Sequence, residues 1–225
     1  MAGLLDTIVF DLDGTLVDTA GDLAASLNHA LGALGRPPVP PGSVRAMVGQ
    51  GARRLLAHGL AATGVMTADL VEAGVGPFLA HYGANIAVHS RPFEGVEPVL
   101  DGLAGEGFRL AICTNKPEAL ARQLIEALGW TGRFQALLGA DSRPWRKPDP
   151  RHLIDTVAEA GGHRALFVGD SRTDAETAQA AAVPLVLVGF GYSTEPVDSL
   201  GADHVIDHFA ALPRAIGDIQ ARFTA

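Results

Sequence analysis

The chain has 225 residues, of which 48% are hydrophobic, so it can bury a core and carry a smaller insertion beside one large domain. Its formal net charge of −8 at pH 7 argues against nucleic acid as a partner and leaves small anions as ligands of a local positive pocket. No basic segment precedes a long apolar one near the first residue, and no apolar stretch approaches about 18 residues, so we expect a cytoplasmic protein that is neither secreted nor membrane-spanning.

The chain begins with a short apolar run, Thr7 to Phe10, whose β-branched and aromatic residues predict a buried strand. Apolar residues at helical spacing then predict three helices, over residues 18–34, 44–60 and 68–82. Because no strand signal interrupts them, these helices break the alternation of strand and helix. We therefore predict a helical cap domain inserted over residues 19–89, and a core domain formed by residues 1–18 and 90–225.

From residue 96 onward, predicted helices and strands alternate regularly. The strands cover residues 109–113, 134–138, 165–168 and 185–188, and the helices cover residues 97–106, 117–128, 150–160 and 173–182. An edge strand at Val205-Ile206 and a C-terminal helix complete the pattern. Such units form a parallel sheet with right-handed crossovers, so the predicted fold class is α/β. The one cysteine, Cys113, lies in an apolar run and is expected to be buried in a strand, which fits a reducing cytoplasm.

Polar segments follow three of the predicted strands at the point where each strand ends. Phe10 leads into Asp11, Cys113 leads into Thr114-Asn115-Lys116, and Val168 leads into Gly169-Asp170-Ser171. Ligands of open parallel sheets bind beyond the carboxyl ends of the strands. The three segments are therefore expected to converge on one site.

Asp11 and Asp13 place two carboxylates close together, since Asp11 ends a strand and Asp13 follows in a turn that Gly14 permits. Such a pair repels itself unless a cation or a shared proton is present. One interpretation is an Asp-rich turn that caps the next helix. The other is catalytic: Asp11 attacks a phosphoryl group, while Asp13 protonates the leaving oxygen and later deprotonates water.

Further candidates lie in two of the connecting loops. Thr114 offers a hydroxyl to a phosphate oxygen, with a helix cap as the alternative role. Lys147 lies in a proline-bracketed loop, where an ammonium would offset phosphate charge unless the residue is merely a solvated loop lysine. Lys116, the other lysine of the chain, is expected to be exposed at the start of a helix. Thr173 to Glu176 fits a capping box, so Asp174 is expected to be partly structural.

The motifs D-L-D-G-T, T-N-K-P, K-P-D-P and G-D-S-R-T-D occur in this order, and the chain resembles the haloacid dehalogenase-like hydrolases. This resemblance implies a Rossmann-like parallel sheet with a helical cap and magnesium-dependent hydrolysis of a phosphate ester. It assigns Asp11 as nucleophile, Asp13 as acid and base, Thr114 and Asn115 as phosphate-binding residues, Lys147 as a catalytic, phosphate-binding charge stabiliser, Asp170 as metal ligand, and Asp174 as a supporting residue. Magnesium prefers hard oxygen ligands, so Asp11, Asp170 and the backbone carbonyl of Asp13 are expected to hold Mg²⁺.

Within that superfamily, the longer match D-L-D-G-T-L-V-D-T resembles the phosphoglycolate phosphatases, which implies 2-phosphoglycolate as substrate. The open alternatives are a mutase similar to β-phosphoglucomutase, a phosphatase for other sugar phosphates or pyrophosphate, and a non-catalytic phosphate-binding module. In the cap, Arg53 or Arg54 is a candidate for a substrate carboxylate, with surface arginines as the alternative, and we assign neither. The sequence does not decide between monomer and homodimer.

Overall fold

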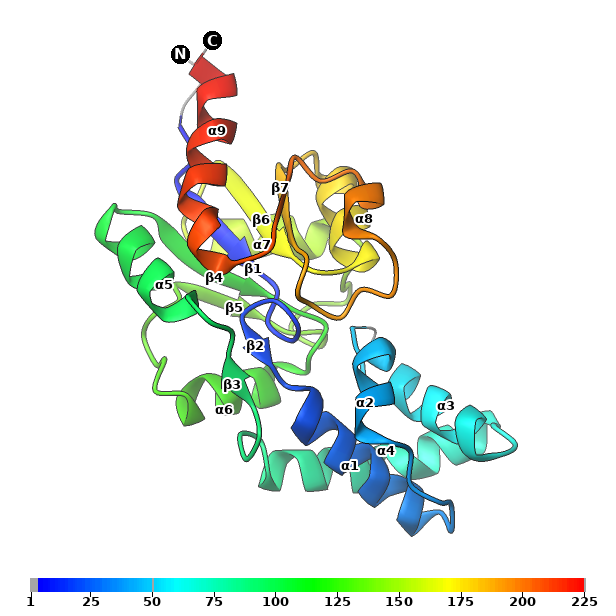
Figure 1. Cartoon of the computed structure of the whole chain (residues 1–225). Helices are drawn as coiled ribbons and strands as arrows, with labels where there is room; N and C mark the ends of the chain where they lie inside the picture. The colour runs from blue at the N-terminus through cyan, green and yellow to red at the C-terminus, as the bar shows by residue number, and fades with distance from the viewer. Residues whose placement is uncertain (1–3, 50, 225) are drawn as a thin grey trace.

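A parallel sheet forms the centre of the computed structural model, which describes residues 4–49 and 51–224 (Figure 1). Within these residues its strand order is β5-β4-β1-β6-β7-β8, with every neighbouring pair parallel. The strands are β1 (Thr7–Phe10), β4 (Arg109–Cys113), β5 (Ala136–Leu138), β6 (Ala165–Gly169), β7 (Leu185–Val188) and β8 (His204–Ile206). The predicted α/β fold class with a Rossmann-like sheet is confirmed.

Helices cover both faces of the sheet, because successive side chains of a strand point to opposite faces. Ile8 and Phe10 belong to one hydrophobic cluster and Val9 to another, and all three are fully buried. The first face carries α5 (Val96–Gly105) and α9 (Leu212–Thr224), and the second carries α7 (Pro150–Glu159) and α8 (Arg172–Ala181). The remaining helix of this part, α6 (Glu118–Ala127), contacts β5 at the sheet edge. Two 3₁₀ turns, η2 (Val197–Leu200) and η3 (Phe209–Ala211), flank β8.

A second group of helices packs together beside the carboxyl edge of the sheet (Figure 1). It comprises α1 (Ala20–Ala33), α2 (Pro41–Val44), the 3₁₀ turn η1 (Arg45–Met47), α3 (Ala52–Thr63) and α4 (Ala68–Ala84). Leu27, Leu56 and Phe78 form part of its buried interior. The prediction of one continuous helix over residues 44–60 is wrong. Gly49 and Gly51 have φ angles of 110° and 85°, which a helix does not allow, so the first part forms η1 and α3 starts at Ala52.

Two short segments join the helical group to the sheet. β2 (Val17–Asp18) pairs antiparallel with β3 (Arg91–Pro92), a pairing too short to leave a periodic signal in the sequence. Beside it, the fully buried carboxylate of Asp22 accepts hydrogen bonds from the backbone N–H groups of His89 and Ser90 and from the Ser90 hydroxyl, at 2.6–3.0 Å. The division into a core of 1–18 and 90–225 and a cap of 19–89 stays a prediction. No helix among the described residues combines the length and apolar character that a membrane span requires.

Candidate active site

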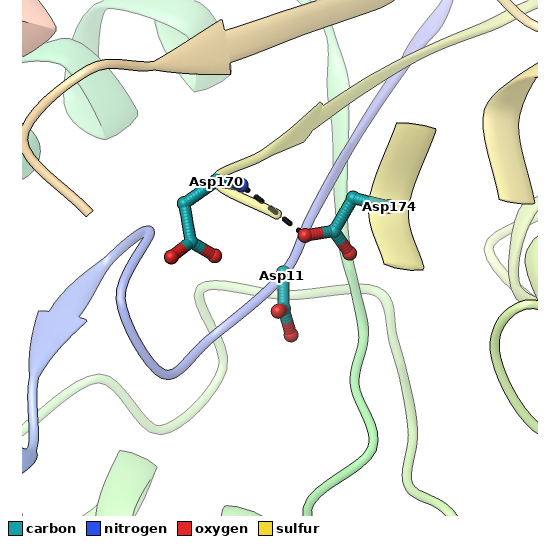
Figure 2. A group of neighbouring side chains, drawn as sticks. All are labelled: Asp11, Asp170 and Asp174. Carbon is teal, nitrogen blue, oxygen red and sulfur yellow. Dashed lines mark hydrogen bonds between the residues drawn. The ribbon is translucent and has the colours of Figure 1, made fainter. Parts of the chain in front are cut away.

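Asp11, Asp170 and Asp174 come from two adjacent strand ends and the helix that follows one of them (Figure 2). The β1–β6 register pairs Phe10 with Val168, and the Asp11 N–H continues the ladder with a hydrogen bond of 2.9 Å to the Val168 carbonyl. The three side chains each present an oxygen within 4.8 Å of the others, and all three are buried. The segments that follow β1 and β6 therefore converge at the carboxyl edge of the sheet, as predicted.

Gly14 lets the turn after β1 approach this cluster closely. Its φ is +89°, and a Cβ there would lie 2.5 Å from Oδ2 of Asp170. A residue with a side chain would therefore combine backbone strain with a collision against a buried carboxylate. This is the physical reason for a glycine directly after Asp13.

Asp174 occupies the first turn of α8, where both of its oxygens are engaged. Oδ2 accepts hydrogen bonds from the Ser171 hydroxyl at 2.6 Å and from the backbone N–H groups of Asp170 and Ser171 at 3.2 and 3.1 Å (Figure 2). The capping box of α8 is therefore formed by Ser171 and Asp174, and the box predicted from Thr173 to Glu176 is wrong, because the helix already begins at Arg172. Oδ1 accepts from the Lys147 ammonium at 2.6 Å. Asp174 is thus placed to orient its neighbours.

Lys147 reaches into the cluster from the loop between β5 and α7. Its Nζ lies 3.0 Å from Oδ1 of Asp11 as well as 2.6 Å from Asp174, and its side chain is only 1% exposed. Burial by itself lowers the pKa of Lys147, but the charges of Asp11 and Asp174 outweigh it, and the net pKa is raised. Lys147 therefore stays protonated, and the alternative of a solvated loop lysine is wrong.

The surplus of buried carboxylates makes this place suitable for a cation. Burial raises the pKa of Asp11 to about 6. The charge of Lys147 opposes this rise, and the charge of Asp174 adds to it. Burial, with Asp174 and Asp11, also raises the pKa of Asp170 well above its usual value. Asp174 is already saturated, whereas Oδ2 of Asp11 accepts no hydrogen bond from the described residues. Asp170 accepts one hydrogen bond at each oxygen, from the Thr15 hydroxyl at 3.3 Å and from the Tyr192 N–H at 2.6 Å. Asp11 and Asp170 are thus less fully bonded than Asp174 and better placed to offer oxygen ligands to a metal ion.

Thr114 and Asn115 follow β4, whose last residues lie beside β1. The Thr114 N–H donates to the Leu138 carbonyl at 3.0 Å, which fixes the loop against β5. The Asn115 amide donates to the backbone carbonyl of Lys147 at 3.1 Å, so the two loops are tied together. Oδ1 of Asn115 is buried and has no hydrogen-bond partner among the described residues. A buried acceptor without a partner is costly, and it lies in a loop that borders the site.

Lys116 corrects the expectation of an exposed lysine at the start of a helix. It is 5% exposed, and its Nζ lies 2.9 and 3.1 Å from the two oxygens of Asp13 and 2.5 Å from the Tyr82 hydroxyl on α4. The helix begins at Glu118, so Lys116 belongs to the preceding loop, and its side chain turns beneath α4. The sequence carried one signal for this position, since the chain contains just two lysines and the other is Lys147.

A cavity of about 50 Å³ lies beside Asp11 and is lined by residues of the neighbouring loops and helices. Its polar lining includes Asp11, Asp13, Thr114, Asn115, Lys116 and Tyr82. Its apolar wall is formed by side chains of both helical groups, including Leu23, Val48, Leu55, Phe78, Leu79 and Leu120. That Tyr82 and these apolar side chains line the cavity could not be predicted from the sequence, because helical periodicity indicates which residues are buried but not what they face.

Tyr192 links the carboxylate cluster to the junction between the sheet and the helices. Its backbone N–H donates to Oδ2 of Asp170 at 2.6 Å. Its hydroxyl accepts from the N–H groups of Thr19 and Ala20 at 2.7 and 3.0 Å and donates to Oδ1 of Asp18 at 2.7 Å. One residue thus orients Asp170 and also satisfies free N–H groups at the start of α1.

A parallel sheet with a lysine-compensated carboxylate cluster at its carboxyl edge, closed over by helices, defines an α/β enzyme that acts on a small ligand. A family model described as "haloacid dehalogenase-like hydrolase" matches residues 5–182. The chain belongs to the haloacid dehalogenase-like hydrolase family, as its motifs predict.

The chain is similar over most of its length to phosphoglycolate phosphatases. It is 49% identical to that of Caulobacter vibrioides over 93% of this chain and 90% of the relative. It is 45% identical to that of Agrobacterium fabrum over 92% and 91%. Among solved structures, a predicted phosphoglycolate phosphatase from Haemophilus somnus 129PT superposes with a TM-score of 0.85 at 31% identity, covering 93% of this chain and 97% of the other. The predicted enzyme class, a phosphoric monoester hydrolase, is confirmed.

Proposed function

We propose that this chain is a magnesium-dependent phosphatase that hydrolyses 2-phosphoglycolate to glycolate and phosphate through a phosphoryl intermediate on Asp11. The observation that carries the proposal is the juxtaposition of Asp11 with Lys147, 3.0 Å apart at the carboxyl edge of the sheet, together with the cavity that Asp11 and Asp13 line. A buried carboxylate with an ammonium beside it and an oxygen free of hydrogen bonds is equipped to act as a nucleophile.

Asp11 supplies the nucleophile of the first half of the reaction. One of its carboxylate oxygens forms a bond to phosphorus as the bond between phosphorus and the leaving oxygen breaks. Asp13 gives a proton to that leaving oxygen, so that glycolate departs as an alcohol. In the second half, Asp13 takes a proton from a water molecule, which attacks phosphorus and frees Asp11 and inorganic phosphate. Two displacements of lower barrier thereby replace one.

Thr114, Asn115 and Lys147 are proposed to bind the phosphoryl oxygens. The Thr114 hydroxyl and the loop amides are donors, and Lys147 offsets the negative charge that two carboxylates bring near a phosphate dianion. Asp174 holds Lys147 in this position through its 2.6 Å contact. Asn115 fixes the spacing of the two loops through its bond to the Lys147 carbonyl.

Asp11, Asp170 and the backbone carbonyl of Asp13 are proposed to hold Mg²⁺. The donor set fits, since magnesium takes hard oxygen ligands and keeps several waters. The charges also fit: Asp11, Asp13, Asp170 and Asp174 carry −4 when ionised and Lys116 and Lys147 carry +2, which leaves −2 for a divalent ion to balance. When bound, the ion supplies charge compensation that lets the carboxylates approach a phosphate.

The choice of 2-phosphoglycolate as substrate is supported by the similar curated proteins. The relatives named above are phosphoglycolate phosphatases by name. Nothing in the site favours the mutase, the other phosphatases or a non-catalytic module, and they become outcomes of the test.

The test is a phosphate-release panel of 2-phosphoglycolate, hexose phosphates, nucleotides and pyrophosphate, with isomerisation of glucose 1-phosphate scored separately. We expect kcat/KM to be highest for 2-phosphoglycolate, turnover to stop on chelation and to return with Mg²⁺. Asp11→Asn is expected to lose activity by a factor on the order of 10³ or more, because the nucleophile is removed. The matched control Asp101→Asn changes a carboxylate that is 65% exposed and should keep full activity.

Three results would contradict the proposal. If the protein isomerises glucose 1-phosphate in preference to hydrolysing phosphate esters, it is a mutase similar to β-phosphoglucomutase. Unchanged phosphate release by Asp11→Asn would show that Asp11 is not the nucleophile. Activity that survives exhaustive chelation would show that turnover does not require a metal ion at the carboxylate cluster.

A further inference from the structure

Lys116 is a buried cation for which phosphate-ester cleavage at Asp11 provides no role. Its side chain is 3% exposed, and two partners hold it: the Asp13 carboxylate at 2.9 and 3.1 Å, and the Tyr82 hydroxyl at 2.5 Å. The ammonium also lies 4.4 Å from the centre of the Tyr82 ring, within the range of a cation–π interaction. Lys147 already serves as the cation beside Asp11. The position of Lys116 therefore calls for a different explanation.

The cavity places Lys116 on the side of the leaving group. Asp11 marks where the phosphoryl group is attacked, and Asp13 must contact the ester oxygen to protonate it. Lys116 contacts Asp13 from the direction of α4, so a group one or two bonds beyond the ester oxygen comes within its reach. Among the described residues that line the cavity, Lys116 is the one positively charged side chain, and most of the wall around it is apolar.

The charge of the leaving group matters because the ammonium of Lys116 is itself buried beside largely apolar side chains. A buried ammonium needs a compensating partner, and losing one is costly in a medium of low dielectric constant. When Asp13 turns towards the ester oxygen, Lys116 loses part of its compensation. A carboxylate on the leaving group restores the charge compensation of Lys116. A neutral group does not restore it, and a cationic group repels the ammonium.

The arginines near the cavity are not placed for this role. Arg53 lies at the start of α3 but is exposed, and its guanidinium pairs with Glu72 at 2.7 and 3.1 Å. Arg54 is exposed as well. Neither of them lines the cavity.

We propose that Lys116, supported by Tyr82, is the specificity-determining residue of the cavity and selects phosphate esters whose leaving group carries a carboxylate close to the ester oxygen. The proposal rests on the proposed function and deepens it by naming the substrate class. In 2-phosphoglycolate one carbon separates the ester oxygen from the carboxylate. That spacing suits contacts with Asp13 and Lys116 at the same time, because these two side chains touch.

The experiment compares three esters of nearly equal size that differ in the charge of the leaving group: 2-phosphoglycolate, 2-hydroxyethyl phosphate and 2-aminoethyl phosphate. The readout is the ratio of kcat/KM for the anionic ester to kcat/KM for the neutral one. This ratio cancels any damage to the shared phosphoryl site. The wild type should prefer the anionic ester and disfavour the cationic one.

Lys116→Met is expected to lower the ratio by about 10- to 100-fold, the range expected for a lost charge-assisted hydrogen bond. Lys116→Arg keeps the charge and should retain most of the preference. Tyr82→Phe keeps the cation but removes the hydroxyl that holds it, so the ratio should fall by a smaller factor; this variant also serves if Lys116→Met does not fold. Arg53→Met is the matched control, because it removes an exposed cation from the same helical group and should leave the ratio unchanged.

Four results overturn the proposal. Equal kcat/KM of the wild type for the three esters means that the cavity does not select charge. An equal loss on all esters in Lys116→Met, with Tyr82→Phe unchanged, assigns Lys116 a structural or chemical role. A fall in the anionic-to-neutral ratio of kcat/KM in Arg53→Met would mean that Arg53 on α3 recognises the carboxylate of the leaving group. A wild type inactive on every phosphate ester means that the proposed function itself has failed, which the first three results do not imply.

Discussion

The ammonium of Lys147 lies 2.6 Å from Oδ1 of Asp174, and neither side chain is more than 1% exposed. Asp174 is held in turn by the capping box of α8, so the start of one helix fixes a cation that belongs to a distant loop. This contact holds Lys147 beside Asp11 without the help of a substrate. It also makes the pair sensitive to the loss of either partner.

Asp174→Asn is expected to destabilise the protein by about 3–5 kcal/mol, because it leaves Lys147 undercompensated in the interior and weakens the capping box. Urea denaturation in the presence of a chelator measures the change in the free energy of unfolding. Glu72→Gln is the control, since it breaks an ion pair whose two side chains are 65% and 59% exposed. Its effect should be small. Equal effects of the two substitutions would mean that the buried pair is not structurally important.

Magnesium should raise the thermal stability of the wild type and not that of Asp170→Asn. A ligand that binds the folded chain stabilises it by roughly 2.7 kcal/mol at 100 times its Kd. Thermal unfolding at several Mg²⁺ concentrations reads this stabilisation without any turnover. Asp207→Asn is the control, as it changes a carboxylate outside the cluster formed by Asp11, Asp170 and Asp174. A Mg²⁺-dependent shift that survives in Asp170→Asn would place the ion elsewhere.

The contribution of Asp11 and Asp170 to the stability of the metal-free protein should fall as pH rises from about 4 to about 6 and beyond, against an opposite contribution from His152, whose pKa burial lowers to about 4. The pKa of Asp11 is raised from 3.8 to about 6 by burial, so in this window the folded chain keeps a proton that the unfolded chain has released. Asp170, whose pKa is also raised, extends the loss to higher pH. The raised pKa of Lys147 stabilises the folded chain at all pH values below its unfolded pKa of 10.5, so it adds no slope here.

The contribution of Asp11 is on the order of 2–3 kcal/mol, since one pKa unit corresponds to about 1.4 kcal/mol. The free energy of unfolding of the wild type minus that of Asp11→Asn, measured in chelator between pH 4 and pH 7, isolates this contribution. The difference should fall with pH, and Mg²⁺ should abolish the fall. A difference that rises with pH would show that Asp11 is stabilised as a carboxylate without the metal.

Asp22→Asn should weaken the attachment of the helical group to the sheet. Asp22 accepts hydrogen bonds from two backbone N–H groups and one hydroxyl at the junction, and hydrogen bonds to charged groups contribute about 1.5–3 kcal/mol each. A loss of at least about 2 kcal/mol is expected in chemical denaturation. Asp69→Asn, which changes an exposed acid in the first turn of α4, is the control. A similar effect of both would contradict a special role for the buried carboxylate.

Local chemistry made most of the sheet and its catalytic edge predictable. The apolar runs that end at Phe10, Cys113 and Val168 form adjacent strands, and the residues after them meet as expected. Lys147 and Asp174 were predictable as well, because each lies in a motif that resembles one of the family's motifs. The helical region was less predictable. Two glycines with positive φ divide the predicted helix over residues 44–60, and periodicity does not register such a break.

The sequence by itself determined the class of fold, the family and the residues at the strand ends, because a strand forces whatever follows it to the sheet edge. Only the tertiary structure decided the environment of Lys116. Its burial against Asp13 and Tyr82 depends on how α4 lies over a loop 34 residues away along the chain. The electrostatic energy of a charge depends on the distances and solvent exposure around it, and these arise from packing between segments that no local pattern relates.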